Sequence, residues 1–278
     1  MNNRSTVDLN INEISILSCF DDPRYAKLAI ENRVNYETNQ PFPHICFDNF
    51  LPPDIADVIG DEYPKIHGMS KHWKYHDNKN VRRYFLENTT QFSTRMKMFA
   101  SAITSRSFLL FLETLTGIPA LLPDPYLMGG GAMVTGKGGF LNVHVDFNWH
   151  QKIQAWRRCN VLFYLTPDWE ECWGGNLELW STDGSRKVKE ISPLFNRVVI
   201  FSTTSESYHG QPIPISSPDE KYRHVFSAFY YATAKSDKID NHPHFTKYNA
   251  DNNDLQAKTE TSPYAERITQ EYVDSGSV

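Results

Sequence analysis

Apolar and polar residues follow two different periodicities along the chain, and the change from one to the other falls near residue 120. In the segments 52–63 and 91–116 apolar residues recur at three- and four-residue spacing, which predicts amphipathic helices. The first segment opens with two prolines, which favour the first turn of a helix. For the second, Ser107 is the predicted N-cap and Gly117 the predicted stop.

Beyond residue 120 the segments become short, apolar or alternating, and rich in aromatic residues, which predicts strands. Connections such as TPDWEECWGG, STDGS and PISSPDE have the composition of turns. Many short strands without intervening helices favour an antiparallel sandwich or jelly roll over a parallel α/β sheet, so the predicted class is mainly β with supporting helices (α+β). The strands predicted beyond residue 120 are 132–135, 140–147, 157–165, 176–180, 196–202 and 223–232. One earlier strand is predicted at 43–51.

Composition and charge narrow the class of protein. Of the 278 residues, 40% are hydrophobic and 22% charged, which is ordinary for a globular chain with a large core. The net charge of −5 and the lack of a long Lys/Arg run argue against a protein that wraps duplex DNA, and no nucleic-acid partner is expected. The sequence contains no long apolar stretch, so no membrane span is predicted, and the N-terminus MNNRSTVDLN does not resemble a signal peptide. Four cysteines without CxxC spacing favour a reducing, cytoplasmic location over a disulfide framework or zinc ribbon: Cys19, Cys46, Cys159 and Cys172.

The stretch NVHVDFNWH, residues 142–150, carries a His and an Asp two positions apart on a predicted strand. Side chains at this spacing project to one face, so His144 and Asp146 can point into a barrel together. A His on a neighbouring strand would complete the two-His, one-carboxylate face that binds non-heme Fe(II). His209, which follows the apolar run NRVVIF, is the predicted third ligand. By itself, the His-x-Asp pair is equally consistent with a polar patch on a barrel wall.

Arg223 begins the otherwise apolar strand RHVFSAFYYA. A buried guanidinium needs an anionic partner, which a dicarboxylate ligand would supply through a two-pronged ion pair. Strand alternation places Ser227 on the same face, where its hydroxyl can add a donor. The alternative is that Arg223 pairs with a nearby carboxylate such as Asp219.

Five sequence blocks occur in order between residues 120 and 232: GGGAMVT, GGFLNVHVDFN, RRCNVLFYLTPDW, WGGNLELW and FNRVVIFSTTSESYHGQPIPISSPDEKYRHVFSAFYY. In this order they resemble the Fe(II)- and 2-oxoglutarate-dependent dioxygenases, and within them the branch related to prolyl 4-hydroxylase. The earlier segment PFPHICFDNFLPPDIADVI is a looser match. The resemblance implies a double-stranded β-helix, a cupin-like jelly roll, as the catalytic core.

The resemblance also implies residue roles. His144, Asp146 and His209 would ligate iron, and Arg223 would bind the distal carboxylate of 2-oxoglutarate. Asn160 stands where the prolyl hydroxylase pattern RxxTxLxYL has a Thr that helps to seat the cosubstrate. Arg223 stands where the prolyl hydroxylases use Lys, and it can still bind a carboxylate. Because related halogenases have Gly or Ala in place of the acidic ligand, Asp146 favours hydroxylation.

The predicted activity is hydroxylation of an unactivated C–H bond of a small-molecule, carrier-tethered or peptidyl substrate, with release of succinate and CO₂. Fe(II) and 2-oxoglutarate are the implied cofactor and cosubstrate, dioxygen is the oxidant, and ascorbate is a candidate reductant. One alternative is a nucleic-acid demethylase of the same superfamily, which should show a basic surface. Another is a non-catalytic jelly-roll binding module, which would leave the predicted ligands and Arg223 without a purpose.

The predicted layout is one catalytic domain with appended segments. An N-terminal extension covers 1–40, a helical support region 41–119, the catalytic core 120–234 and a polar C-terminal segment 235–278. Substrate choice is predicted to lie in three loops: 65–90, 147–156 and 210–222.

The remaining basic and imidazole side chains are not predicted to be metal ligands. Lys152, Arg157 and Arg158 either meet an anionic substrate or form an exposed basic rim. The other histidines are expected in a solvated segment that is a candidate substrate-side loop (His72, His76), at the surface or rim (His150), facing away from Arg223 (His224) and in the tail (His242, His244).

Overall fold

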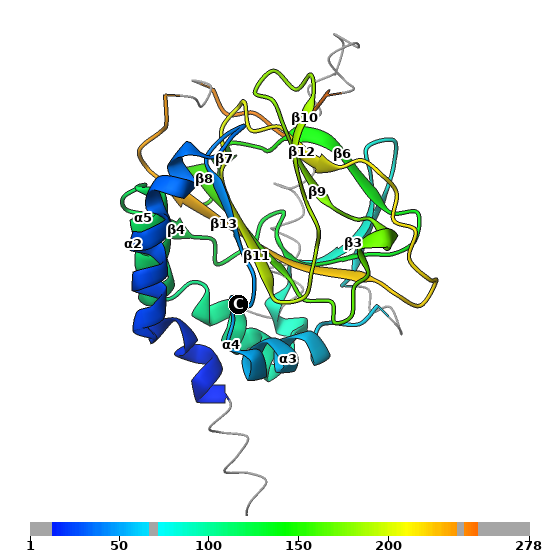
Figure 1. The fold of residues 1–278 in the computed structure, drawn as a ribbon, viewed down its shortest axis with the longest axis horizontal. Helices are drawn as coiled ribbons and strands as arrows, with labels where there is room; N and C mark the ends of the chain where they lie inside the picture. Colours follow the sequence, from blue (N-terminus) through cyan, green and yellow to red (C-terminus); the bar gives the residue numbers. More distant parts are fainter. Residues whose placement is uncertain (1–12, 67–71, 238–241, 250–278) are drawn as a thin grey trace, which may run out of the picture.

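The computed structural model describes residues 13–66, 72–237 and 242–249 (Figure 1). In these residues helices gather on one side of a curled 14-stranded sheet whose paired strands are all antiparallel. The α-helices are α2 (Pro23–Thr38), α3 (Pro53–Asp61), α4 (Thr94–Ala102) and α5 (Arg106–Thr116), and the short 3₁₀ helices are η1 (Cys19–Asp21), η2 (Thr89–Gln91) and η3 (Glu171–Trp173). The strands before the predicted core are β1 (His44–Phe47), β2 (Lys74–Asp77) and β3 (Val81–Leu86). The later strands are β4 (Leu122–Pro123), β5 (Gly131–Thr135), β6 (Phe140–Val145), β7 (Trp149–His150), β8 (Ala155–Tyr164), β9 (Leu177–Trp180), β10 (Lys187–Ile191), β11 (Arg197–Ser202), β12 (His209–Gln211), β13 (Arg223–Ala232) and β14 (Lys247–Tyr248).

The strand order brings distant parts of the sequence together. The main path runs β1-β11-β8-β13-β5-β3-β6-β12-β9-β10, so β12 lies beside β6 and β13 beside β8. In the β6–β12 pair His209 lies opposite His144. Gln211 lies opposite Leu141, because β6 carries a bulge between Leu141 and His144. This curled antiparallel sheet confirms the predicted jelly-roll class.

The helical layer covers the outer face of the sheet at β8, β11 and β13. Figure 1 shows α2 and α5 side by side, with α3 and α4 at the end of the sheet. Phe163, on β8, contacts aromatic rings from both helical and loop segments, at centroid distances of 5.1 Å to Phe99 and 6.1 Å to Phe50 and Phe108. This aromatic cluster joins the helices to the strands that carry the site.

The helix predicted at 91–116 is two helices. The chain turns between α4 and α5, and the N-cap of α5 is Ser105, whose hydroxyl accepts from the Phe108 N–H at 3.3 Å. The prediction of Ser107 as the cap was therefore wrong by two residues; Ser107 instead donates to the Asp21 carboxylate. Gly117 ends α5 in the left-handed conformation, with a φ of 70°, as predicted.

Strands also occur where the sequence pattern did not predict them. β2 and β3 form a hairpin within the segment expected to be helical support or loop, and β3 pairs with both β5 and β6. Near the end of the described chain β14 pairs with β6, so residues from the polar C-terminal segment lie against the metal-ligand strand.

No single helix in the described ranges is long and apolar enough to cross a membrane. Helices α4 and α5 meet the length and composition test only as a pair bent by 44°. Their apolar side chains Phe99, Phe108 and Leu112 are buried in the protein core.

Replacing Phe163 with Ala should lower the free energy of unfolding by about 3–5 kcal/mol, because the aromatic cluster would lose its central ring and gain a cavity. Urea unfolding of the apoprotein measures this loss. Ile30→Ala is the matched control, because Ile30 is 68% exposed and its truncation should change stability by less than about 0.5 kcal/mol. Equal effects of the two substitutions would contradict the packing described.

His224 should make the apoprotein less stable in mild acid. Its ring stacks on Tyr63 at 4.4 Å, as expected for a side chain facing away from Arg223, and burial lowers its pKa to about 4. As the pH falls from 6.5 towards 4, the unfolded chain takes up a proton that the folded chain does not, so the folded state loses stability. His224→Phe should keep the stacking and reduce the pH dependence of the unfolding free energy by up to about 1 kcal/mol per pH unit. Unchanged pH dependence in this variant would contradict the assignment.

Candidate metal and cosubstrate site

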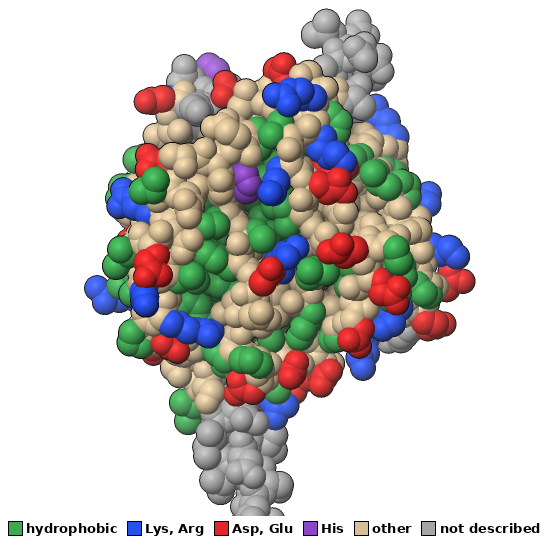
Figure 2. Space-filling view, viewed as in Figure 1, with side chains coloured by type: hydrophobic (Ala, Val, Ile, Leu, Met, Phe, Trp, Pro, Cys, Tyr) green, Lys and Arg blue, Asp and Glu red, His purple; other side chains and the backbone are tan. Residues whose placement is uncertain are grey.

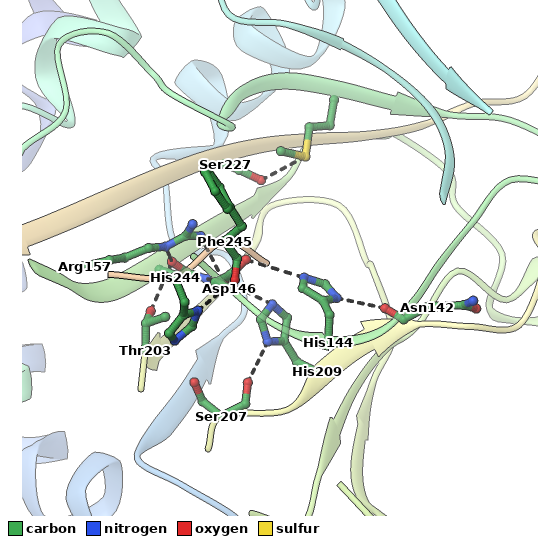
Figure 3. A network of polar contacts seen from close by, with 12 residues as sticks. Asn142, His144, Asp146, Arg157, Thr203, Ser207, His209, Ser227, His244 and Phe245 are labelled. Carbon is green, nitrogen blue, oxygen red and sulfur yellow. Dashed lines mark hydrogen bonds and ion pairs between the residues drawn. The ribbon is translucent and has the colours of Figure 1, made fainter. Parts of the chain in front are cut away.

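Three electron-pair donors meet inside the curled sheet. His144 comes from β6, Asp146 follows that strand, and His209 begins β12. One ligand atom from each lies within 4.8 Å of the other two, and all three residues are buried. The structure therefore brings together the three predicted ligands, with His144 and His209 placed opposite each other by the β6–β12 register (Figure 3).

The two imidazoles are held with the same nitrogen facing the carboxylate. His144 Nδ1 lies 2.8 Å from the Asn142 carbonyl oxygen and His209 Nδ1 lies 2.9 Å from the Ser207 carbonyl oxygen. Since a carbonyl oxygen only accepts, each Nδ1 carries the proton and each Nε2 presents its lone pair. These Nε2 atoms lie 3.5 Å and 3.4 Å from the Asp146 carboxylate oxygens. Such a convergence of lone pairs fits a divalent metal ion.

Asp146 is fixed by two side chains from β8. Arg157 Nη2 lies 2.9 Å from Asp146 Oδ2, and Asn160 Nδ2 donates to the same oxygen at 2.8 Å. The Asn160 amide is itself oriented, because its oxygen accepts from Arg157 Nε at 2.9 Å and from the Thr203 hydroxyl at 3.2 Å. The Arg157 guanidinium stacks over the Phe229 ring at 3.5 Å. These contacts leave Asp146 Oδ1 facing His144.

The protonation states suit metal binding at neutral pH. Burial by itself would raise the pKa of Asp146, but the Arg157 charge and the two imidazoles outweigh it and hold that pKa well below its ordinary value. Burial lowers the pKa of His209 to about 4, so its ring is neutral at pH 7. At neutral pH the site thus presents the charged carboxylate of Asp146 and the neutral imidazole of His209, which are the forms that bind a metal ion.

A second anchoring point lies at Arg223, the first residue of β13. Its Nη1 donates to the Gly175 carbonyl oxygen, and its Nε is buried without a hydrogen-bond partner in the part of the chain that the structure describes. Gly175 has a φ of +76°, and a Cβ there would lie 3.2 Å from Arg223 Cδ, so the turn at this position needs glycine. Burial lowers the pKa of Arg223 to about 10, which leaves it charged at neutral pH. A buried charge with an unpaired N–H fits a carboxylate ligand.

Ser227 and Asn160 were predicted to assist the cosubstrate, and both line the same pocket. In the structure the Ser227 hydroxyl donates to Met133 Sδ at 3.3 Å. Asn160 contacts Asp146 rather than Arg223, so its visible role is to orient a metal ligand. Contact of either residue with 2-oxoglutarate stays a prediction.

The predicted ligands and Arg223 open into one pocket of about 610 Å³, a volume typical of a small-molecule site. Its lining includes apolar side chains such as Leu162 and Phe201, and also His76, Lys152, the segment 243–246 and Tyr248. Figure 3 shows His244 and Phe245 of this segment beside the metal-ligand cluster. His244 is therefore no remote tail residue: its backbone N–H donates to Asn148 Oδ1 at 2.8 Å.

For Arg157 and for Arg158 the structure argues against one of the two predicted alternatives. Arg157 is 1% exposed and paired with Asp146, so it does not belong to an exposed rim. Arg158 donates to the Ala234 carbonyl oxygen at 2.6 Å and does not line the pocket.

His150, expected at the rim, is fully buried, with its Nε2 3.3 Å from Asp124 Oδ1. The expectation was wrong because the sequence does not show that Asp124, well before it in the chain, folds against it. The pocket also contains Arg83 and Gln211, from β3 and β12, which were not among the predicted site residues. The one sequence feature that could have indicated Arg83 is the alternation of side chains between the two faces of the strand in RRYF, residues 82–85.

Comparison with known proteins supports this geometry. The family described as "2OG-Fe(II) oxygenase superfamily" matches residues 130–231, which include the three converging residues and Arg223. A curated relative, prolyl 3-hydroxylase OGFOD1 of Mus musculus, is 24% identical over 195 residues, or 69% of this chain and 33% of the relative. The chain thus spans about a third of the length of that protein.

Solved structures share the fold. The prolyl-4-hydroxylase of Pseudomonas putida matches with a TM-score of 0.52 and 14% identity, over 73% of this chain and 98% of that chain. HygX from Streptomyces hygroscopicus, with nickel and 2-oxoglutarate bound, matches with a TM-score of 0.51 and 12% identity, over 80% and 98% of the two chains. The α-ketoglutarate-dependent epimerase SnoN from nogalamycin biosynthesis matches with a TM-score of 0.52 and 12% identity, over 78% and 96%.

Asn160→Ala should weaken divalent metal binding by about 10- to 100-fold, because Asp146 would lose the donor that orients it while all three ligands remain. Titration of the apoprotein with Mn(II) by calorimetry measures the dissociation constant. Thr203→Val removes only the longer hydrogen bond to the Asn160 oxygen and should cause a smaller loss. Unchanged metal affinity in Asn160→Ala, with wild-type unfolding behaviour, would show that Arg157 alone orients Asp146.

Proposed function

Because residues 130–231 match the 2OG-Fe(II) oxygenase superfamily and include the converging His144, Asp146 and His209, we propose that this chain hydroxylates an unactivated C–H bond of an organic substrate. One substrate C–H bond, dioxygen and 2-oxoglutarate would give the hydroxylated product, succinate and CO₂. The observation that carries the proposal is the convergence of His144, Asp146 and His209 in a pocket that also contains the buried guanidinium of Arg223.

Each part of the pocket has a task in this reaction. The three converging residues would hold Fe(II), and Arg223 would bind the distal carboxylate of 2-oxoglutarate. When bound, the metal and cosubstrate supply the oxidising chemistry. Arg157 and Asn160 keep the Asp146 carboxylate charged and oriented. Apolar side chains such as Leu162, Phe201 and Val225 line the pocket and restrict water.

Hydroxylation is supported by the intact acidic ligand. Related halogenases have Gly or Ala where this chain has Asp146, and here the carboxylate is retained and charged. The named relatives include prolyl hydroxylases, which makes a prolyl residue one member of the proposed substrate range. A small molecule and a carrier-tethered residue are the other members. Ascorbate is proposed as the reductant that keeps the iron ferrous.

A nucleic-acid substrate is the weaker proposal. The chain has a net charge of −5, and on the face shown in Figure 2 acidic and basic side chains are interspersed. All four cysteines are free thiols, which agrees with the cytoplasmic location that we propose.

The first experiment is anaerobic titration of the apoprotein with Fe(II) and 2-oxoglutarate, followed by the visible charge-transfer absorption of the chelate. Wild-type protein should develop the band, His144→Ala should lose it, and Arg223→Gln should need at least tenfold more 2-oxoglutarate. Admission of air should then release succinate from the wild type and not from Asp146→Ala. Metal binding without the band, or a band equally strong in Arg223→Gln, would contradict the proposed cosubstrate site.

A further inference from the structure

The pocket is strongly basic in a chain that is acidic overall. Among the lining residues that the structure describes, Arg83, Lys152, Arg157 and Arg223 are cationic and Asp146 is the one carboxylate, whereas the whole chain has a net charge of −5. Such a concentration of one sign attracts anionic ligands into a cleft.

The proposed cofactor and cosubstrate do not neutralise this charge. Arg157 is paired with Asp146, and the two positive charges of Fe(II) equal the two negative charges of 2-oxoglutarate. Arg83, Arg223 and Lys152 therefore remain in excess after both have bound. One of them, Arg223, is already assigned to the cosubstrate, so the excess points to a second anionic ligand.

Arg83 is the cation best placed to meet that ligand. It extends from β3 into the pocket, and its buried Nε has no hydrogen-bond partner in the described part of the chain. Among the described residues it has neither an ion pair nor a hydrogen bond from its guanidinium. Burial lowers its pKa, and the positive charge of Arg83 in turn acts on Arg223. Arg83 is partly buried and its charge acts unfavourably on that of Arg223, so an anion bound between them would relieve the repulsion.

Gln211 adds a neutral recognition group on the same wall. Its Nε2 donates to the carbonyl oxygens of Gly139 and Ile213, at 3.2 Å and 2.5 Å, which fixes the orientation of the amide. Its Oε1 is buried, accepts no hydrogen bond from any residue that the structure describes, and belongs to a side chain that lines the pocket. An unpaired buried acceptor is completed by an N–H or O–H donor.

The register places these two groups on neighbouring strands. β6 lies between β3 and β12, and Leu141 of β6 is opposite Val81 on one side and Gln211 on the other. Arg83 is two residues beyond Val81 on β3, on the same face of that strand. One ligand can therefore reach both groups across β6.

We propose that the substrate carries an anionic group, a carboxylate or a phosphate, that Arg83 binds, and a neighbouring N–H or O–H that donates to Gln211 Oε1. This inference rests on the proposed function, since it assigns the substrate end of the same pocket. Arg83 and Gln211 would then determine which molecules place a C–H bond beside the metal.

The test uses protein loaded with Mn(II) and saturating 2-oxoglutarate, which keeps the site occupied without turnover. Three probes are titrated by calorimetry at constant ionic strength: inorganic phosphate, propionate and 3-hydroxypropionate. Wild-type protein should bind phosphate or propionate, and whichever binds more tightly identifies the class of anion. Arg83→Gln should weaken that binding at least tenfold and leave the affinity for 2-oxoglutarate unchanged.

Arg82→Gln is the matched control, because it removes the same charge from the adjacent position. Arg82 is exposed, pairs with Asp77 at 3.0 Å and does not line this pocket, so its substitution should leave anion binding unchanged. Arg83→Lys should retain part of the binding and serves as a folding control. The hydroxyl of 3-hydroxypropionate should improve affinity over propionate in the wild type, and Gln211→Leu should abolish that difference.

Each other outcome overturns a defined claim. If anions bind the wild type no better than Arg83→Gln, or if Arg82→Gln weakens binding equally, Arg83 is not an anion site. If Arg83→Gln weakens the binding of 2-oxoglutarate instead, Arg83 is part of the cosubstrate site. If wild-type protein fails to bind Mn(II) and 2-oxoglutarate at all, the proposed function itself fails before any probe is added.

Discussion

The buried carboxylate of Asp146 is the group on which the rest of the site depends. A lone carboxylate in an apolar sheet would be protonated or displaced towards water, and Arg157 prevents both by pairing with it. Arg157 and Asn160 come from β8, which lies between β11 and β13 and has little freedom to move. The carboxylate is therefore held by the most constrained part of the sheet, while the imidazoles of His144 and His209 approach it from β6 and β12.

The departure from the prolyl hydroxylase pattern at position 160 has a structural meaning. The Asn160 amide donates to Asp146 and accepts from both Arg157 and Thr203, so it completes a closed network. A threonine hydroxyl has one proton and a shorter reach, and would not make all three contacts. The longer side chain at this position thus ties the metal ligand to β8 and to the chain after β11, which makes its position less dependent on bound cosubstrate.

The sequence was sufficient to predict which three residues converge at the candidate metal site and insufficient to predict the wall that carries Arg83 and Gln211. His144 and Asp146 lie two apart on an apolar strand, and His209 and Arg223 follow in the expected order, so local periodicity and motif order were enough. Arg83 lies in KHWKYHDNKNVRRYF, where exposed polar residues of a hairpin conceal the alternation. The segment 242–249 is polar in composition and forms β14 only because the edge of β6 is available for pairing. In both places tertiary contacts, and not local pattern, decide the structure.

The two arginines assigned to ligands differ in how firmly they are held, and this difference suits their tasks. Arg223 is bonded to the Gly175 carbonyl and confined by the turn around it, so its position is set before any ligand arrives. Arg83 has no such bond within the described chain, and an apolar side chain at this position would cost the folded protein less. A preorganised cation suits a cosubstrate that is the same in every turnover, since binding then requires little reordering. An unrestrained cation lowers the stability of the folded protein until a ligand completes the ion pair. We therefore expect the wall formed by β3, β6 and β12 to contribute most to the selectivity of the pocket.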